Sequence, residues 1–499
     1  MSYQHGVYTS EVPTSIKPPV TVNGFVPVVV GTAPVNLASS PKVNEPVLCY
    51  TYAEAVAALG MSDDFENYTL CEHIYSQFVL FGVAPVVLIN VLDPATHKTD
   101  VASEAATLAD GQVKTAVNGA IISTLVVKDD TATTTYVLNT DYTAAFNDDG
   151  ELVITRIADG SIPTDTSQLS LQYSHLNPSA VSADDVIGGV DVNGVSTGLE
   201  LINEVFPRYR LAVTHGLAPK FSTIPAVSAV GKAKMKLVSG NFPAQWLSDI
   251  PTYTDGEQFT WYDQFSFGAE TVTQYADAAA WKNDNNYTAA HEIVCWPKVA
   301  LGSRQFHLST QVACIIGQAT SANDGILNVT PSNRSLQADS AVLADGTEVL
   351  LQNQQANDAL NANGIVTALN WIGGWKAWGN RTAIYPANTD PKDAFIKIRG
   401  FQNWLANTLI LSYWQNVDGD LNRRQIESIT DSNNIFLNGL AAAGQILGGR
   451  LEFNPEDNPT TQLLDGKAVF RLFQASPPPN KAIEFIIEYD ADYLQTLFS

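Results

Sequence analysis

Positive charge is scarce in this sequence. Among its 499 residues, 27 are Lys or Arg and 51 are Asp or Glu, so the formal net charge is −24. An acidic chain repels phosphate backbones, and direct nucleic-acid binding is therefore not expected. Charged residues of both signs make up only 16% of the chain, against roughly 25% in an average soluble domain. Large buried subunit contacts would produce this shortfall, and so would a β-rich surface of Thr, Asn and Ser.

Cysteines and long apolar runs are also rare. The four cysteines form no C-x-x-C pair, and we expect them to be buried free thiols in a reducing cytoplasm; they are Cys49, Cys71, Cys295 and Cys314. The longest apolar stretch, residues 78–89, is interrupted by Gly82 and Pro85. It is shorter than the ~20 residues of a spanning helix. The first residues lack the features of a signal peptide. No membrane insertion is expected.

Motifs for catalysis and for metal binding are missing. The sequence has no phosphate loop, no dinucleotide-binding glycine motif and no nucleophile elbow. His291 and Glu292 lack the second histidine, four positions after the first, that a zinc protease requires. We therefore predict a protein that is not an enzyme and that holds no cofactor or metal.

What the chain does contain is apolar material for a large core, at 45% of residues. Buried-strand runs and helical spacings alternate in residues 25–95, the first α/β part of the core, and again in residues 201–390, an α/β middle domain. Residues 391–476 are predicted to form a C-terminal domain containing two helices. The expected fold is a multidomain α/β and α+β protein whose mixed core is built from N- and C-terminal halves.

Residues 96–200 have a different character. Short strand-like runs alternate with Asp- and Gly-rich turns, as in an antiparallel β domain. Four Lys and Arg stand against fifteen Asp and Glu, a net charge of −11. We expect this segment to be a β-rich outer domain inserted between the α/β parts.

Both ends of the chain are predicted to be extended arms. In residues 1–24, Pro13, Pro18 and Pro19 exclude a helix. In residues 477–499, three prolines form a stiff spacer before a strand with one apolar face. The residues expected to make arm contacts are Val7, Tyr8, Val20, Val22, Ile483, Phe485, Ile487 and Tyr489. The alternatives are a floppy N-terminus and, at the C-terminus, an edge strand of the chain's own sheet.

Several short motifs resemble the contractile tail sheath proteins of bacteriophages and related tailocins. The most specific is Trp378, Gly379, Asn380, Arg381 and Thr382, which resembles the Trp-Gly-Asn-Arg-Thr motif of that family. Residues 6–8 and 11–13 resemble the family's opening, residues 29–34 its first core strand and turn, and residues 477–489 its C-terminal arm. Family members carry variable outer insertions where this chain has residues 96–200.

The resemblance implies a structural subunit of the virion tail, assembled in the host bacterial cytoplasm. Sheath subunits stack as hexameric rings into a helical sleeve around a tail tube, and each lends its arms to neighbours to complete a β-sheet. Contraction drives the tube through the cell envelope without nucleotide hydrolysis. The implied partners are further copies of the chain, the tail tube protein, and baseplate and tail terminator proteins.

Basic residues of the C-terminal domain are the candidates for facing a tube. Lys392, Lys397 and Arg399 are predicted to lie on one helix, with Lys392 and Arg399 on a shared face because they are seven residues apart. Arg423 and Arg424 follow later in the chain. A solvated polar face is the alternative reading of these charges.

Two other functions fit the sequence less well. One is a different structural virion protein, such as a baseplate or capsid subunit. The other is a surface-acting adhesin or enzyme with a β-rich binding module.

Overall fold

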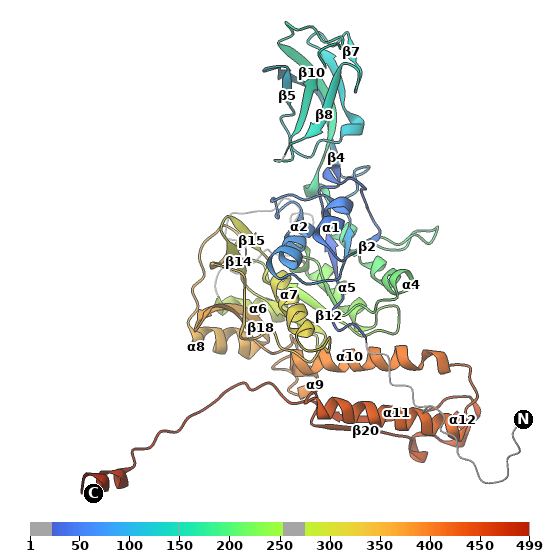
Figure 1. Cartoon of the computed structure of the whole chain (residues 1–499), viewed down its shortest axis with the longest axis vertical. Helices are drawn as coiled ribbons and strands as arrows, with labels where there is room; N and C mark the ends of the chain where they lie inside the picture. Colours follow the sequence, from blue (N-terminus) through green and yellow to red (C-terminus); the bar gives the residue numbers. More distant parts are fainter. Residues whose placement is uncertain (1–21, 148, 253–274, 499) are drawn as a thin grey trace, which may run out of the picture.

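The computed structural model describes residues 22–147, 149–252 and 275–498. Figure 1 shows a β domain at one end, an α/β body in the middle and a layer of long helices at the other end. The C-terminal segment leaves this last layer as an isolated extension. The mixed α/β architecture expected from the sequence is confirmed.

A nine-stranded sheet forms the centre of the body. Its order is β16 (Arg334–Ser335), β19 (Gly374–Trp378), β18 (Ile365–Trp371), β13 (Glu292–Cys295), β12 (Gln245–Asp249), β11 (His215–Leu217), β1 (Pro27–Gly31), β3 (Val86–Asn90) and β2 (Pro46–Cys49). The strands from β18 to β3 pair in parallel, and the edges are antiparallel. Strands β1 and β3 are buried throughout, as parallel strands covered on both faces must be.

Helices cover both faces of this sheet. They are α1 (Tyr52–Leu59), α2 (Thr69–Ile74), α3 (Ala183–Ile187), α4 (Val205–Tyr209), α5 (Pro225–Lys236), α6 (Tyr275–Asp284), α7 (Leu308–Ser321) and α8 (Asn353–Gln355). Successive side chains of β12 point to opposite faces: the Ser248 hydroxyl meets Ser228 of α5, and Asp249 accepts from Ser309 of α7. A small sheet of β14 (Lys298–Leu301), β15 (Arg304–Phe306) and β17 (Ser340–Val342) lies beside the body.

The outer domain is made of two antiparallel sheets. One contains β4 (Lys98–Thr107), β10 (Gln168–Leu176), β6 (Val126–Asp129) and β7 (Thr135–Tyr136), and the other contains β5 (Gln112–Lys114), β9 (Leu152–Arg156) and β8 (Tyr142–Phe146). The domain has its own apolar core, which includes Val127, Tyr142, Leu152 and Leu171. It is joined to the body by the paired ends of β4 and β10, where Lys98 lies opposite Leu176.

Residues 177–200 do not belong to this outer domain, although the sequence placed them there. Val181, Val186, Leu199 and Ile202 are buried in the main core cluster, and α3 packs on α5. The sequence-based boundary was wrong because these residues are separated from the first core segment by the whole insertion, so nothing local indicates which core they join.

The C-terminal domain is a helical layer with a β-hairpin. Its elements are α9 (Pro391–Ala394), α10 (Ile396–Tyr413), α11 (Arg423–Ala442), β20 (Gly448–Glu452), α12 (Thr460–Leu464) and β21 (Arg471–Ala475). Helix α10 buries Phe401, Trp404 and Leu405 against the body, which fixes this layer to the sheet.

We predict that residues 99–175 can be removed without unfolding the body. Lys98 and Leu176 face each other on antiparallel strands, which places their Cα atoms about 5 Å apart, so a short Gly/Ser link closes the gap. All nine tryptophans lie outside residues 96–200. Urea unfolding followed by tryptophan fluorescence should therefore give a midpoint close to that of the parent.

The matched control is a longer deletion, from residue 94 to residue 198. It removes Leu176, Val181 and Val186 from the main core, and each lost apolar side chain of this size costs about 1–4 kcal/mol. We expect this variant to be insoluble or strongly destabilised. Equal stability of the two deletion variants would contradict the boundary at Leu176.

Candidate functional site

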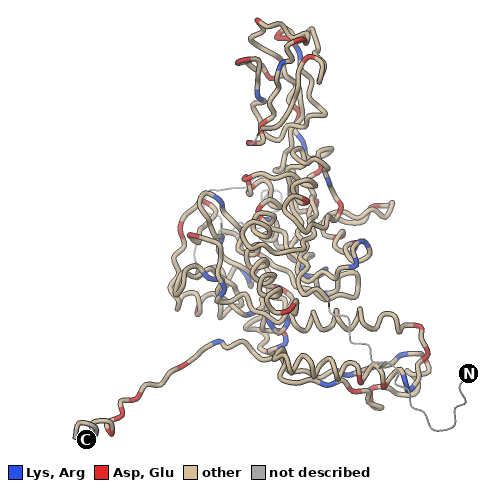
Figure 2. Tube along the Cα trace, viewed as in Figure 1, with Lys and Arg blue, Asp and Glu red and all other residues tan. Residues whose placement is uncertain are grey.

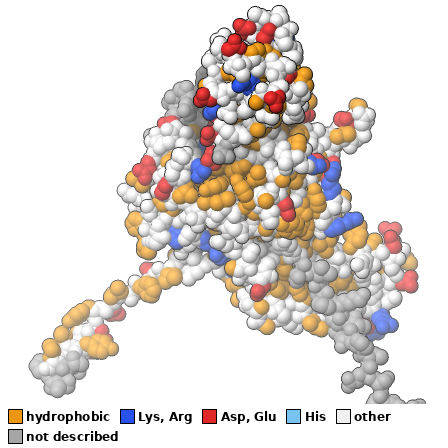
Figure 3. Space-filling view, turned by 45° about the horizontal axis from the view of Figure 1, so that its top comes forward, with side chains coloured by type: hydrophobic (Ala, Val, Ile, Leu, Met, Phe, Trp, Pro, Cys, Tyr) orange, Lys and Arg blue, Asp and Glu red, His pale blue; other side chains and the backbone are white. Residues whose placement is uncertain are grey.

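The C-terminal segment pairs with no strand in the described part of its own chain. Residues 477–490 are extended but pair with no strand there, and Figure 3 shows apolar side chains along an isolated stalk. Ile483, Phe485, Ile487 and Tyr489 are 70–93% exposed. The sequence predicted a strand here; the structure has its extended backbone without a neighbouring strand.

The root of this segment is held by α10. The Lys397 ammonium donates to the carbonyl of Pro477 at 3.1 Å. Prolines at positions 477–479 then favour a stiff, extended backbone. The segment is therefore directed away from the body from its first residues.

The hairpin formed by β20 and β21 is an incomplete sheet. Five residue pairs join its strands, from Gly448 opposite Ala475 to Glu452 opposite Arg471, and no other described strand joins either edge. Asn434 of α11 accepts from the Leu451 amide and donates to its carbonyl, so its side chain occupies the outer edge of β20, and the edge of β21 stays open. Isolated two-stranded hairpins are marginally stable, and open edges attract further strands.

The predicted N-terminal arm is described only at its last residues. Val7, Tyr8 and Val20 lie outside the described residues. Val22 packs against the core of its own subunit, and the Trp404 indole donates to its carbonyl at 3.1 Å. Val22 is thus part of the body here, contrary to its assignment to an arm that contacts a neighbour.

The basic residues before α11 do not form the predicted track. Phe395 is extended, with φ −109° and ψ 127°, and separates α9 from α10, so Lys392 and Arg399 do not share one helix. Arg399 is mostly buried and pairs with Asp393 at 3.1 Å, and the half-exposed Lys392 lies 3.2 Å from the same carboxylate. Burial lowers the pKa of Lys397 and of Arg399.

The other two candidates lie at the start of α11. The Arg423 side chain is 91% exposed and pairs with Glu427 at 2.7 Å. Arg424 is also exposed. Figure 2 shows basic residues around this end of α11, whereas acidic residues predominate along the C-terminal segment.

The Trp-Gly-Asn-Arg-Thr motif forms the junction between the sheet and the C-terminal domain. Trp378 ends β19, and its indole donates to Asn357 at 2.8 Å. The Arg381 guanidinium lies 3.7 Å from the Phe395 ring centroid. Thr382 donates to two backbone carbonyls, from its amide to Ala394 at 3.2 Å and from its hydroxyl to Asp393. The motif thereby sets the position at which α10 begins.

Gly379 gives this junction its close packing. Its φ is +140°, and a Cβ there would lie 2.8 Å from the Asn361 side chain and 3.0 Å from backbone atoms of residues 365–366. Only glycine combines this backbone conformation with that separation.

A buried cluster of Ser, His and carboxylate groups lies at the start of α7. Glu72 accepts from the His307 amide, from His307 Nδ1 at 2.9 Å and from Thr310 at 3.0 Å. Asp249 accepts from the amide and hydroxyl of Ser309, and burial raises its pKa. All five residues are at most 4% exposed, so the cluster caps a helix and offers no access to a substrate.

The cysteines are poor nucleophiles because burial raises the pKa of each thiol, to about 12 at Cys49 and Cys71. Within residues 22–147, 149–252 and 275–498, no group of three His, Cys, Asp or Glu side chains is placed to hold a metal ion. None of the described helices combines the length and apolarity needed to cross a bilayer.

Comparison with known proteins shows which proteins this chain is similar to. No family model matches the chain. The tail sheath protein of Burkholderia phage BcepMu is 28% identical over 516 aligned residues, covering 99% of this chain and 98% of the relative. The major tail sheath protein of Serratia phage KSP20 is 29% identical over 30% of this chain and 36% of its own.

A solved structure has the same fold. The sheath complex of the extracellular contractile injection system PVC, in its contracted state, superposes with a TM-score of 0.55 over 99% of both chains at 12% identity. The chain is a homologue of contractile tail sheath proteins. It is a structural subunit of a contractile tail sheath, as the sequence motifs indicated.

Sequence reasoning missed two parts of this sheath subunit that bear on assembly. One is the open hairpin. Its first strand begins at Gly448, and in the sequence the glycine pair at positions 448–449 indicates the end of a helix. The other is a surface groove beside it, formed by α11, α12 and Phe453. Leucines next to short helical segments were the available signal for the groove. However, α11, Phe453 and α12 come together only in the folded chain.

We predict that Gly379→Ala destabilises the sheath subunit by about 3 kcal/mol or more, because the new Cβ adds a clash to a backbone strain of about 1–3 kcal/mol. The matched control is Gly374→Ala. Gly374 also has a positive φ, +87°, but open space around a Cβ, so we expect a loss of about 1 kcal/mol. Urea unfolding measures both; similar losses would contradict a packing role for Gly379.

Proposed function

We propose that this subunit polymerises as stacked hexameric rings around a tail tube and contracts to drive the tube through the host cell envelope. Further copies of the chain are its main partners, and the tail tube, baseplate and tail terminator proteins are the others. Assembly in the bacterial cytoplasm and incorporation into the virion tail follow from this function. The observation that carries the proposal is one unpaired extended segment and one open hairpin in the same chain.

Exchange of the C-terminal strand is the proposed link between subunits. Residues 482–489 offer a strand with one apolar face, and β21 offers an open edge. Addition of a strand supplies backbone hydrogen bonds for affinity and side-chain contacts for register. The segment cannot fold back easily onto its own hairpin, because the proline spacer leads away from it.

The same arrangement fits contraction. The body has a closed core and buried helix caps, and the root of the C-terminal segment is held by a hydrogen bond from Lys397. Subunits can therefore change their relative orientation while the body stays folded and the exchanged strands remain bound. Stored energy then lies in contacts between subunits, as in other two-state assemblies.

We predict that truncation after Ser476 leaves a folded monomer that forms no sleeves. The removed segment contributes no core side chain, so the midpoint of urea unfolding should stay near that of the parent, while negative-stain microscopy shows no assemblies. A loss of several kcal/mol by the monomer would mean that the strand packs within its own chain.

Two double variants test the apolar face without shortening the chain. Phe485→Asp with Ile487→Asp should abolish sleeves, because both side chains would be buried on an acceptor. Glu484→Ala with Glu488→Ala changes the opposite face and should leave sleeves intact. Sleeves from the first variant, or loss of sleeves in the second, would contradict the proposed orientation of the strand.

Tube contact is proposed for the exposed basic residues of the C-terminal domain. Lys397 and Arg399 are engaged inside the subunit, which leaves Lys392, Arg423 and Arg424 as the exposed candidates. An acidic tube surface would be attracted to them over a Debye length of about 8–10 Å.

Replacing Lys392 and Arg424 by Glu should weaken co-sedimentation with tubes, and binding of the parent should fall steeply with salt. The matched control is Lys114→Glu with Lys128→Glu, which makes the same charge change on strands β5 and β6 of the outer domain. Unchanged binding by the first variant, or equal weakening by both, would reject a specific basic tube contact.

A further inference from the structure

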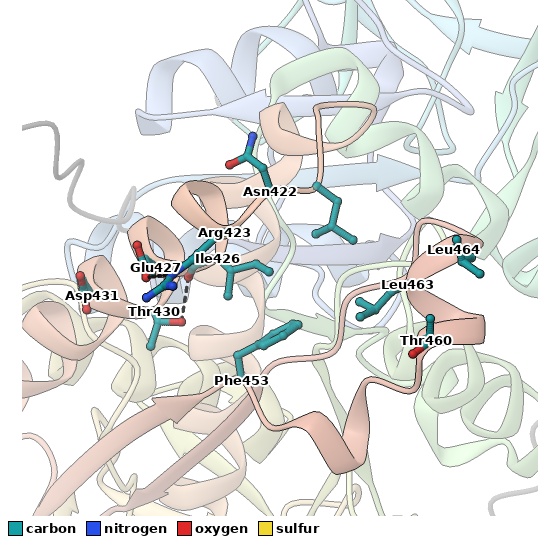
Figure 4. A pocket seen from close by; sticks show the side chains of 11 residues that line it. Asn422, Arg423, Ile426, Glu427, Thr430, Asp431, Phe453, Thr460, Leu463 and Leu464 are labelled. Atoms are coloured by element: carbon teal, nitrogen blue, oxygen red, sulfur yellow. Dashed lines mark hydrogen bonds and ion pairs between the residues drawn. The ribbon is translucent and has the colours of Figure 1, made fainter.

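An apolar groove opens beside the free hairpin of the C-terminal domain. Figure 4 shows its lining from the first turns of α11, from Phe453 directly after β20, and from α12. Its volume is about 650 Å³. The apolar residues that line it are Leu421, Ile426, Phe453, Leu463 and Leu464.

The groove leaves large apolar side chains in water. Leu464 is 83% exposed and Leu421 is 39% exposed. A concave and mostly apolar surface of this kind suits the apolar side chains of a bound helical segment. Within the described residues of the chain, nothing fills it.

The last residues of the chain carry a matching surface. Residues 491–498 form a short helical element, Ala491–Phe498, in the described structure. Leu494 and Leu497 are three residues apart and share one face of a 3-10 helix, and they are 49% and 75% exposed. Tyr493 next to them is exposed as well.

We infer that the groove of one subunit binds the C-terminal helical element, residues 491–498, of a second copy of the chain. This inference rests on the strand exchange proposed above and adds a second contact to it. The donated strand would align the subunits, and the terminal element would anchor its end.

The direction of the hairpin supports this occupant. Strand β20 runs from Gly448 to Glu452, and the next residue, Phe453, lines the groove. A donated strand that pairs antiparallel with β21 runs in the same direction as β20. Tyr489 then lies at the Glu452 end, and the residues after it reach the groove.

The chain's own terminus is directed elsewhere. Its C-terminal segment starts after Ala475, which pairs with Gly448 at the end of the hairpin opposite the groove. In Figure 1 the C-terminus and α12 lie on opposite sides of the molecule. The occupant is therefore supplied in trans.

Cross-linking in assembled sheaths tests the contact directly. The native cysteines Cys49, Cys71, Cys295 and Cys314 are buried, so Leu464→Cys with Leu494→Cys introduces two accessible thiols. A short bismaleimide should convert sheaths of this variant into covalent multimers on a denaturing gel. The control is Leu447→Cys with Leu494→Cys, because Leu447 is 72% exposed at the other end of the hairpin; it should cross-link at least tenfold less.

A deletion separates this inference from strand exchange. Removing residues 491–499 keeps the strand, so sheaths should still form, but the protein concentration needed for assembly should rise about tenfold or more because two leucines lose a buried site. Assembly at the parent's concentration, or an absence of multimers from cross-linked sheaths, would overturn the inference and leave strand exchange standing. Assembly by the truncation after Ser476 would instead overturn both.

Discussion

The backbone of the C-terminal segment lacks hydrogen-bond partners in the described part of its own chain. From Pro478 to Tyr489 no backbone hydrogen bond is formed within the described structure, while apolar side chains line one face of the same stretch. In a monomer, water can satisfy these polar groups, but the apolar face stays exposed, and this combination favours pairing with a sheet edge. The monomer therefore exposes apolar surface that suits contact with another subunit.

The rest of the structure keeps the body folded while the C-terminal segment extends away from it. The central sheet has buried parallel strands and helices on both faces, and the start of α7 is capped by Glu72 and Asp249 instead of by solvent. At the other border, Arg381 and Thr382 tie the sheet to the first helices of the C-terminal domain. Relative motion between subunits thus need not loosen the interior of any one of them.

Local sequence patterns were sufficient for part of this fold. Strands β1 and β3 are continuous apolar runs, and the outer β domain shows regular turn signals. The break at Phe395 was not predictable, because it depends on Arg381, whose guanidinium packs on that ring from fourteen residues earlier. The burial of residues 177–200 in the main core likewise depends on helix α5, which follows them in the chain and packs on α3.

The candidate site also has one part that local sequence patterns predict and other parts that they do not. The apolar alternation at Ile483–Tyr489 is a property of consecutive residues and can be read directly. The open hairpin and the groove are formed by segments that are separate in the sequence. Lys392 and Arg399 do not share a helix face because the extended Phe395 separates α9 from α10.

The narrow neck between the body and the outer domain has a consequence for how such chains diversify. Because the domain enters and leaves through two neighbouring residues of one antiparallel ribbon, Lys98 and Leu176, any domain whose own ends lie close together satisfies the same geometry. This domain can therefore be exchanged, enlarged or lost during evolution, or replaced by another folded domain, without altering the register of the strands of the body.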